Sequence, residues 1–208
     1  MIRSILLPLD GSRPSAAACE WGLALAERFQ APIEGIHVYA AQLHGERFQE
    51  MEPGLPLRYQ APDELNRLRD THDLIIGGGL KLISDAYLEG FRSRAVGLGL
   101  TFSTSTPEGR NYVEILRAAE RGRHDLIALG ALGLGQVASS AVGGVAGRVA
   151  RHFGGHVLVA RHSVLPPQGP VVVGVDGSAT AYHAVKQAVA LAKAFGGAVE
   201  AVAVFDPY

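Results

Sequence analysis

The sequence has one cysteine, Cys19, in 208 residues. A single cysteine builds neither an internal disulfide nor a thiolate metal site within one chain, which is typical of a reducing compartment. The sequence also has no surplus of charge, because 19 basic residues nearly balance 20 acidic ones. Without a broad basic field, we expect no nucleic-acid partner.

Long apolar runs are also missing from the start of the chain. The run at residues 5–9 is interrupted by Pro8 and is much shorter than a signal-peptide core or a membrane span. We therefore expect a cytoplasmic protein with no membrane partner.

Several catalytic patterns are absent too. The sequence contains no Gly-x-Ser-x-Gly elbow and no Gly-x4-Gly-Lys-[Ser/Thr] loop, so it shows neither a serine nucleophile nor the lysine that stabilises a transferring phosphate. His152 and His156 have the spacing of a metal-binding pair, but Gly154 and Gly155 between them should end a helix. We expect no metal site and no catalytic residue.

What the sequence does have is an alternation of short apolar runs and helical patterns. Buried parallel strands are nearly continuous in apolar residues, and amphipathic helices repeat their apolar positions every three to four residues. The pattern predicts an α/β protein with an open, doubly wound parallel sheet and helices on both faces. The expected strands are 5–9, 32–40, 100–106, 125–130 and 156–161, and the clearest helices are 13–29, 112–122 and 145–153.

Between the second and third strands the pattern is less regular. Residues 41–61 contain Pro53 and Pro56 with little periodicity, which predicts a loop. Residues 62–97 have a helical pattern, but the three consecutive glycines at 77–79 should break it and place the main helix after the break. Further on, Asn111 with Glu114 three residues later predicts a capping box.

The beginning of the chain is repeated near its end. Residues 171–205 align without gaps on residues 5–39, and the ten identical positions include Asp10-Gly11-Ser12, which match residues 176–178. We expect a first domain at 1–161, a linker at 162–169 and the start of a second copy at 170–208. Because one βαβ unit leaves strand edges open, we expect this second copy to be part of a longer tandem protein or to be completed by another chain.

A glycine-rich stretch follows the expected fourth strand, with five glycines in residues 130–144. Ligands of doubly wound sheets bind beyond the carboxyl ends of the strands, and the free N–H groups of a helix N-terminus attract anions. We expect Gly130 and Gly133 to let the chain turn sharply, and Gly143 and Gly144 to precede a phosphate-binding helix that begins near Val145.

Asp10 ends the first expected strand at the same edge of the sheet. Its carboxylate would repel phosphates, so ribose hydroxyls or Mg²⁺ are better partners for it. The alternative is a structural role as a turn residue or a helix cap. Val38, near the end of the second strand, offers only its backbone to an adenine edge. Arg148 is a phosphate ligand or a solvated residue.

At this point the sequence resembles a known family. The glycines at 130, 133 and 143 resemble the G-x-x-G-x9-G-[S/T] ATP-binding signature of the universal stress proteins, and ILLPLDGS, VVVGVDGS and GHVLVAR resemble that family's first and last strands. The resemblance covers residues 2–161 and restarts at 170. It implies a five-stranded sheet in the order 3-2-1-4-5.

The resemblance also implies an ATP site. The segments that surround adenine and ribose in ATP-binding members match Pro8, Leu9, Asp10 and Val38. Those that wrap the phosphates match Gly130, Gly133, Gly143, Gly144 and Val145. One departure is Gly144, which stands where the family has Ser or Thr and so removes a hydroxyl; Ser139 or Ser140 are candidate substitutes.

These observations leave three functions open. We expect an ATP-binding regulatory protein of the stress-response type, with ATP as cofactor, with or without Mg²⁺, and no dedicated catalytic machinery beyond slow hydrolysis. The main alternative is an interaction scaffold of the same fold with an empty loop. An adenylate-forming enzyme is disfavoured because no Lys, Asp or Glu lies between Gly130 and Val145. In either of the first two cases, the resemblance implies pairing through the last strand, in a homodimer or between tandem domains.

Overall fold

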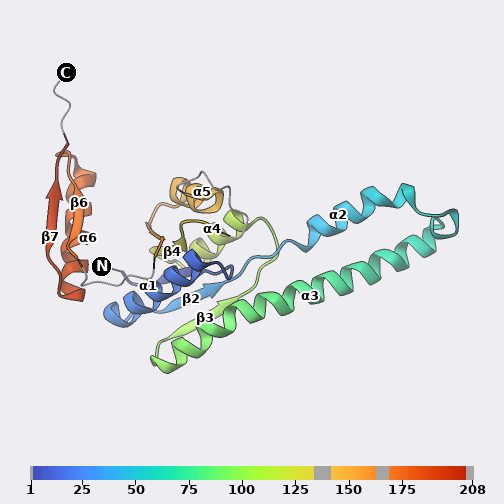
Figure 1. The fold of residues 1–208 in the computed structure, drawn as a ribbon, viewed down its shortest axis with the longest axis horizontal. Coiled ribbons are helices and arrows are strands. Elements are labelled where there is room, and N and C mark those ends of the chain that lie inside the picture. Colours follow the sequence, from blue (N-terminus) through green and yellow to red (C-terminus); the bar gives the residue numbers. More distant parts are fainter. Residues whose placement is uncertain (1, 134–141, 163–168, 205–208) are drawn as a thin grey trace, which may run out of the picture.

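The computed structural model describes residues 2–133, 142–162 and 169–204. Five parallel strands form one sheet in the order β3-β2-β1-β4-β5, and two more parallel strands form a separate sheet (Figure 1). The fold class expected from the sequence is confirmed. The first sheet and its helices are β1 Ile5–Pro8, α1 Arg13–Phe29, β2 Ile33–Ile36, α2 Ala41–Met51, α3 Pro62–Gly97, β3 Phe102–Ser105, α4 Asn111–Arg121, β4 Leu126–Gly130, α5 Gly144–His152 and β5 His156–Ala160.

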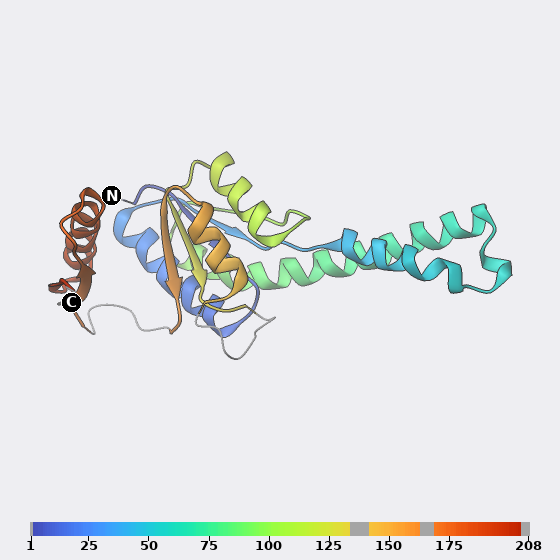
Figure 2. The ribbon, with the colours of Figure 1, turned by 90° about the horizontal axis from the view of Figure 1, so that it is seen from above.

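Helices cover both faces of the five-stranded sheet (Figure 2). On one face Leu7 packs in a cluster with Leu23 of α1 and Phe91 of α3. On the other face the adjacent residue Leu6 packs in a cluster with Ile115 of α4. Leu6 and Leu7 are both fully buried, which explains why β1 is apolar at consecutive positions instead of alternating.

The turn between β1 and α1 is fixed by hydrogen bonds of its own residues. Gly11 has a φ of +75°, a conformation that favours glycine. Ser12 is the N-cap of α1, where its Oγ accepts a hydrogen bond from the N–H of Ser15 at 3.2 Å. This turn holds Asp10 at the carboxyl edge of the sheet.

Residues 41–83, called the arm below, project from the sheet as a pair of helices (Figures 1 and 2). The loop expected at 41–61 is wrong, because α2 fills Ala41–Met51 and two 3-10 turns follow at Glu52–Gly54 and Leu57–Tyr59. The break expected at residues 77–79 is also wrong, since α3 is one continuous helix from Pro62 to Gly97.

Two physical causes explain why α3 passes through three glycines. Each glycine costs about 1 kcal/mol relative to alanine, but a break would require a second helix nucleus, which is itself unfavourable. Packing against α2 also holds the helix: Arg69 pairs with Glu52 at 2.6 Å, and the rings of Phe48 and His72 lie 4.6 Å apart.

The capping box expected at Asn111 is not formed. Arg110 is the N-cap of α4, without a side-chain hydrogen bond, and Asn111 is the first helical residue. Glu114 pairs instead with Arg117 at 2.6 Å. The helix therefore begins one residue earlier than the box requires, and the Asn111 side chain is left to line a cavity described below.

The second sheet belongs to the repeat, with β6 at Val171–Gly174, α6 at Ala179–Phe195 and β7 at Val199–Val202. Ser178 caps α6 through the N–H of Ala181, as Ser12 caps α1. The Trp21 and Phe195 rings meet edge to face at 6.2 Å between the two units. Within the described ranges, no helix has the length and apolarity needed to cross a membrane.

We predict that Gly79→Ala stabilises the arm by about 0.5–1 kcal/mol, because alanine favours the helix and no heavy atom lies within 4 Å of the position its Cβ would take. Native-state hydrogen exchange of the α3 amides measures the effect as slower exchange. Gly35→Ala is the opposite control, since its Cβ would lie 2.6 Å from the Phe91 ring and should lower global stability. Faster exchange of the α3 amides in Gly79→Ala would contradict the prediction.

Candidate functional site

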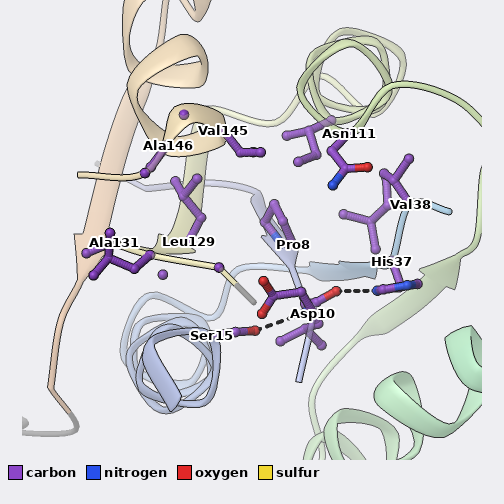
Figure 3. Close-up of a pocket in the computed structure, with 18 of the residues that line it drawn as sticks. Pro8, Asp10, Ser15, His37, Val38, Asn111, Leu129, Ala131, Val145 and Ala146 are labelled. Carbon is purple, nitrogen blue, oxygen red and sulfur yellow. Dashed lines mark hydrogen bonds between the residues drawn. The ribbon is translucent and has the colours of Figure 1, made fainter. Parts of the chain in front are cut away.

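A cavity of about 580 Å³ opens at the carboxyl edge of the five-stranded sheet (Figure 3). The ends of β1, β2 and β4 form its floor, and the N-termini of α4 and α5 border it. The site residues expected from the sequence all line this cavity; they are Pro8, Leu9, Asp10, Val38, Gly130, Gly133, Gly143, Gly144 and Val145. Their contact with a nucleotide stays a prediction.

Asp10 has the structural role that the sequence left open as one alternative, and its role toward a ligand stays a prediction. Its Oδ1 accepts a hydrogen bond from the N–H of Ser12 at 3.0 Å, which is the turn-forming role. Its own N–H donates to Ser15 Oγ at 3.1 Å. No described residue donates a hydrogen bond to Oδ2, so one carboxylate oxygen remains for a ligand in the cavity.

Gly130, the last residue of β4, and Gly133 both lie close to the start of α1, and a backbone contact excludes a side chain only at Gly130. A Cβ at residue 130 would lie 2.7 Å from the backbone of Pro14 and Ser15, and a Cβ at residue 133 would lie 2.7 Å from Asp10 Oδ2. Neither glycine has a φ in the left-handed region. The sharp turn expected at these glycines is therefore better described as a close approach of the chain to the start of α1.

The N-terminus of α5 presents backbone donors to the cavity. Gly143 is its N-cap, without a side-chain hydrogen bond, and donates its own N–H to Ala131 O at 2.7 Å. The next N–H groups, of Gly144, Val145 and Ala146, have no acceptor among the described residues, as the geometry of a first helical turn requires. Together with the positive end of the helix dipole, they form a site for an anion.

Gly144 differs from the other glycines of the site. No heavy atom of the described residues lies within 4 Å of the position that its Cβ would take. Among those residues, a serine there would have no contact to relieve. The candidate substitutes Ser139 and Ser140 lie outside the described residues.

Arg148 lines the cavity one turn after Gly144. Its guanidinium carbon lies 5.0 Å from the centre of the Tyr112 ring, a cation–π distance. This contact places a positive charge beside the N-terminus of α5, so the charge adds to the anion-attracting field of the helix.

The sequence reasoning missed three polar residues of the cavity, Ser15, His37 and Asn111. The His37 Nδ1 lies 2.6 Å from Leu9 O, and because a carbonyl oxygen only accepts, Nδ1 carries the proton. The His37 ring also meets Tyr87 of α3 at 4.8 Å. The only feature of the sequence that could have indicated His37 is its position directly before Val38, which was expected at the site.

The fold and this cavity define a class of protein: a doubly wound α/β domain with a pocket at the strand ends, where this kind of fold binds its ligands. The model of the universal stress protein family matches residues 1–161 and 169–208. The chain therefore belongs to the universal stress protein family, as its motifs indicated.

Individual relatives agree with this assignment. The universal stress protein Rv2005c of Mycobacterium tuberculosis is 31% identical over 205 residues, which is 96% of this chain and 62% of the relative. The chain thus spans less than two thirds of that protein's length.

Solved structures share the fold at lower identity. A universal stress protein of Archaeoglobus fulgidus has a TM-score of 0.59 at 19% identity, over 98% of this chain and 68% of that one. A universal stress protein in complex with cAMP has a TM-score of 0.50 at 20% identity, over 78% of this chain and 98% of that one.

We predict opposite effects for alanine at two glycines of the site. Gly130→Ala should destabilise the fold by about 1–3 kcal/mol, because its Cβ would overlap a backbone that cannot move independently. Gly144→Ala should leave stability unchanged or raise it by up to about 1 kcal/mol. Denaturant unfolding measures both, and equal stability of the two variants would contradict the close-contact explanation.

Proposed function

We propose that the protein is an ATP-binding regulatory module of the stress-response type, without dedicated catalytic machinery. The observation that carries the proposal is that one cavity brings together the Asp10 carboxylate, the first-turn N–H groups of α5, which have no acceptor among the described residues, and the backbone at Val38. A nucleotide offers hydroxyls, phosphates and an apolar base to these three parts. The complex of a family member with cAMP supports an adenine nucleotide as the ligand class.

In the proposed complex, adenine lies against Val38, Pro8 and Leu9, and its edge meets the Val38 backbone. Asp10 Oδ2 accepts hydrogen bonds from the ribose hydroxyls or binds a Mg²⁺ that accompanies the nucleotide.

The phosphates extend from the ribose toward Gly130 and Gly133 and end at the α5 N-terminus, where the N–H groups of Gly144 and Val145 hold them. Arg148 adds charge at the same end. Each hydrogen bond to a charged group contributes about 1.5–3 kcal/mol, so several must act together for firm binding.

The site supports binding better than catalysis. Among its described residues, the only cation is Arg148, which stacks on Tyr112, and the only carboxylate is Asp10, which is partly used in the β1–α1 turn. Phosphoryl transfer requires several charges placed around the reacting phosphate. The proposed output is therefore a ligand-dependent surface, with at most slow hydrolysis.

The remaining expectations belong to the same proposal. Residues 1–161 form the nucleotide-binding domain, 162–169 the linker and 170–208 the start of a second copy. β5 is an edge strand of the sheet, so pairing through it joins two chains or two tandem domains. A cytoplasmic location is proposed as well.

The binding prediction is tested by calorimetric titration of ATP, with and without Mg²⁺. Asp10→Asn keeps an oxygen for the Ser12 N–H but removes the charge, and should weaken binding about tenfold or more. Gly144→Ser should tighten binding about tenfold, because it adds a hydroxyl at an open position beside the phosphates. Lys81→Ala, on the arm, is the control and should bind as the native chain does.

Two results together would reject the nucleotide proposal. If the folded native chain binds no ATP at millimolar concentration and Gly144→Ser does not restore binding, the nucleotide proposal is rejected. The scaffold function would then remain, with an assembly state that sedimentation finds unchanged by ATP.

A further inference from the structure

The helix that carries the arm, α3, also reaches the edge of the candidate site. From Ser84 onward α3 packs on the sheet, and Ser84, Leu88 and Phe91 are buried there. Before Ser84 the same helix leaves the sheet and continues into the arm (Figure 1). Tyr87 lies one turn before Phe91, on the part of α3 that meets the ends of β1 and β2. A single helix therefore joins the arm to the surroundings of the cavity.

The Tyr87 ring contacts two segments that line the cavity. A Cβ at residue 11 would lie 2.5 Å from Tyr87 Cε1, so the ring lies directly against Gly11. The ring also meets the His37 ring edge to face, with 4.8 Å between the ring centres. Gly11 follows Asp10 and His37 precedes Val38, while Tyr87 itself is not among the residues that line the cavity. The ring therefore supports both segments from outside the cavity.

The turn after β1 depends on such support, because it lies beyond the last β1–β2 pair. Leu9 is still bonded to the end of β2, since its carbonyl oxygen accepts a hydrogen bond from His37 Nδ1 at 2.6 Å (Figure 3). In the described part of the chain, Asp10 and Gly11 have no hydrogen bond to any strand; the bonds of Asp10 go to the start of α1. Tyr87 contacts the turn where these bonds are missing.

We propose that Tyr87 is a positioning residue of the nucleotide site and that, through it, the seating of α3 on the sheet sets the affinity for nucleotide. This proposal rests on the function proposed above and adds the regulation of that site. Tyr87 touches no ligand. It holds the turn that carries Asp10, and it holds the His37 ring beside the Val38 backbone.

The arm is the part of the chain that can change this seating. Tyr87 lies three residues after Ser84, where the arm leaves the sheet, and α3 runs through both as one continuous helix. The other helix of the arm, α2, begins three residues after Val38, and there the N–H of Gln42 donates to Glu108 Oε1 at 2.8 Å. Both ends of the arm are therefore joined to segments at the cavity. Whatever moves α3 moves the ring, and by linkage a nucleotide that fixes the ring also fixes α3.

Calorimetric titration with ATP tests the positioning role. Tyr87→Ala should weaken ATP binding about fivefold or more. Tyr87→Phe should restore the lost affinity, because the ring makes both contacts and the hydroxyl has no hydrogen-bond partner among the described residues. Trp21→Ala is the control: it also removes a partly buried aromatic ring, but one that does not line the cavity and that contacts Phe195, and it should bind ATP as the native chain does.

A double-mutant cycle separates positioning from general destabilisation. In the Asp10→Asn chain, Tyr87→Ala should weaken ATP binding further by less than about twofold, since the charge that the ring positions is already absent. In the Arg148→Ala chain, which is changed at the phosphate end of the cavity, Tyr87→Ala should keep its full effect. A merely structural role of Tyr87 would weaken binding by the same factor in both chains.

Hydrogen exchange tests the reciprocal effect of the nucleotide on α3. Saturating ATP should slow the exchange of the α3 amides around Tyr87 in the native chain. In Tyr87→Ala, saturated at a higher ATP concentration, the same amides should exchange as they do without ATP.

The outcomes separate this inference from the nucleotide proposal. If the native chain binds ATP and Tyr87→Ala binds it equally well, the positioning role is rejected and the nucleotide proposal stands. Equal factors in the Asp10→Asn and Arg148→Ala chains would also reject it, and ATP that binds without slowing exchange in α3 would reject regulation through this helix. A native chain that binds no ATP rejects the nucleotide proposal and this inference with it.

Discussion

The close approach of the chain after β4 to the start of α1 is the contact on which the site depends. Gly130 lies where any Cβ would be 2.7 Å from the backbone of Pro14 and Ser15. The parallel pairing of β1 with β4 brings both strand ends to one edge, and the Ser12 cap fixes the first turn of α1. Given these constraints, Gly133 passes close to Asp10, and a Cβ there would lie 2.7 Å from Asp10 Oδ2. A side chain at residue 133 would therefore require the Asp10 carboxylate to shift.

The parts of the fold that were predictable from the sequence are those whose burial leaves a local pattern. β1 and β4 are buried on both faces, so their residues are continuously apolar; β1 ends at Pro8, two residues before Asp10, and β4 ends at Gly130. Periodicity predicts where the strands lie but not which strands pair with each other. The strand order was therefore predicted from the family resemblance. The cavity residues followed from the same strand ends, since parallel strands present their carboxyl ends to one edge.

The features that the sequence did not predict, the arm and the start of α4, depend on tertiary packing. The arm has few buried residues before Ser84, so its apolar positions do not follow a core-facing stripe. Its stability comes from packing against α2 and the turn that follows it, through contacts such as Arg69 with Glu52 that join residues separated by three prolines. Asn111 was misread for a related reason: its spacing to Glu114 fits a capping box, but the turn at Gly109, with a φ of +148°, starts the helix earlier. No motif in the sequence around His37 predicts that it lines the cavity.

Glycine shows most directly what the sequence cannot predict, because the same residue stands in different surroundings in this chain. At Gly130 a Cβ would lie 2.7 Å from the backbone of Pro14 and Ser15, so contacts within the chain require glycine there. At Gly133 a Cβ would lie 2.7 Å from Asp10 Oδ2, which is the end of a side chain that can shift. At Gly78, in α3, no heavy atom of the described residues lies within 4 Å of that position, and alanine would favour the helix. All three are the same letter in the sequence, and only the space around each missing Cβ distinguishes a glycine that shapes the cavity from one that no described contact requires.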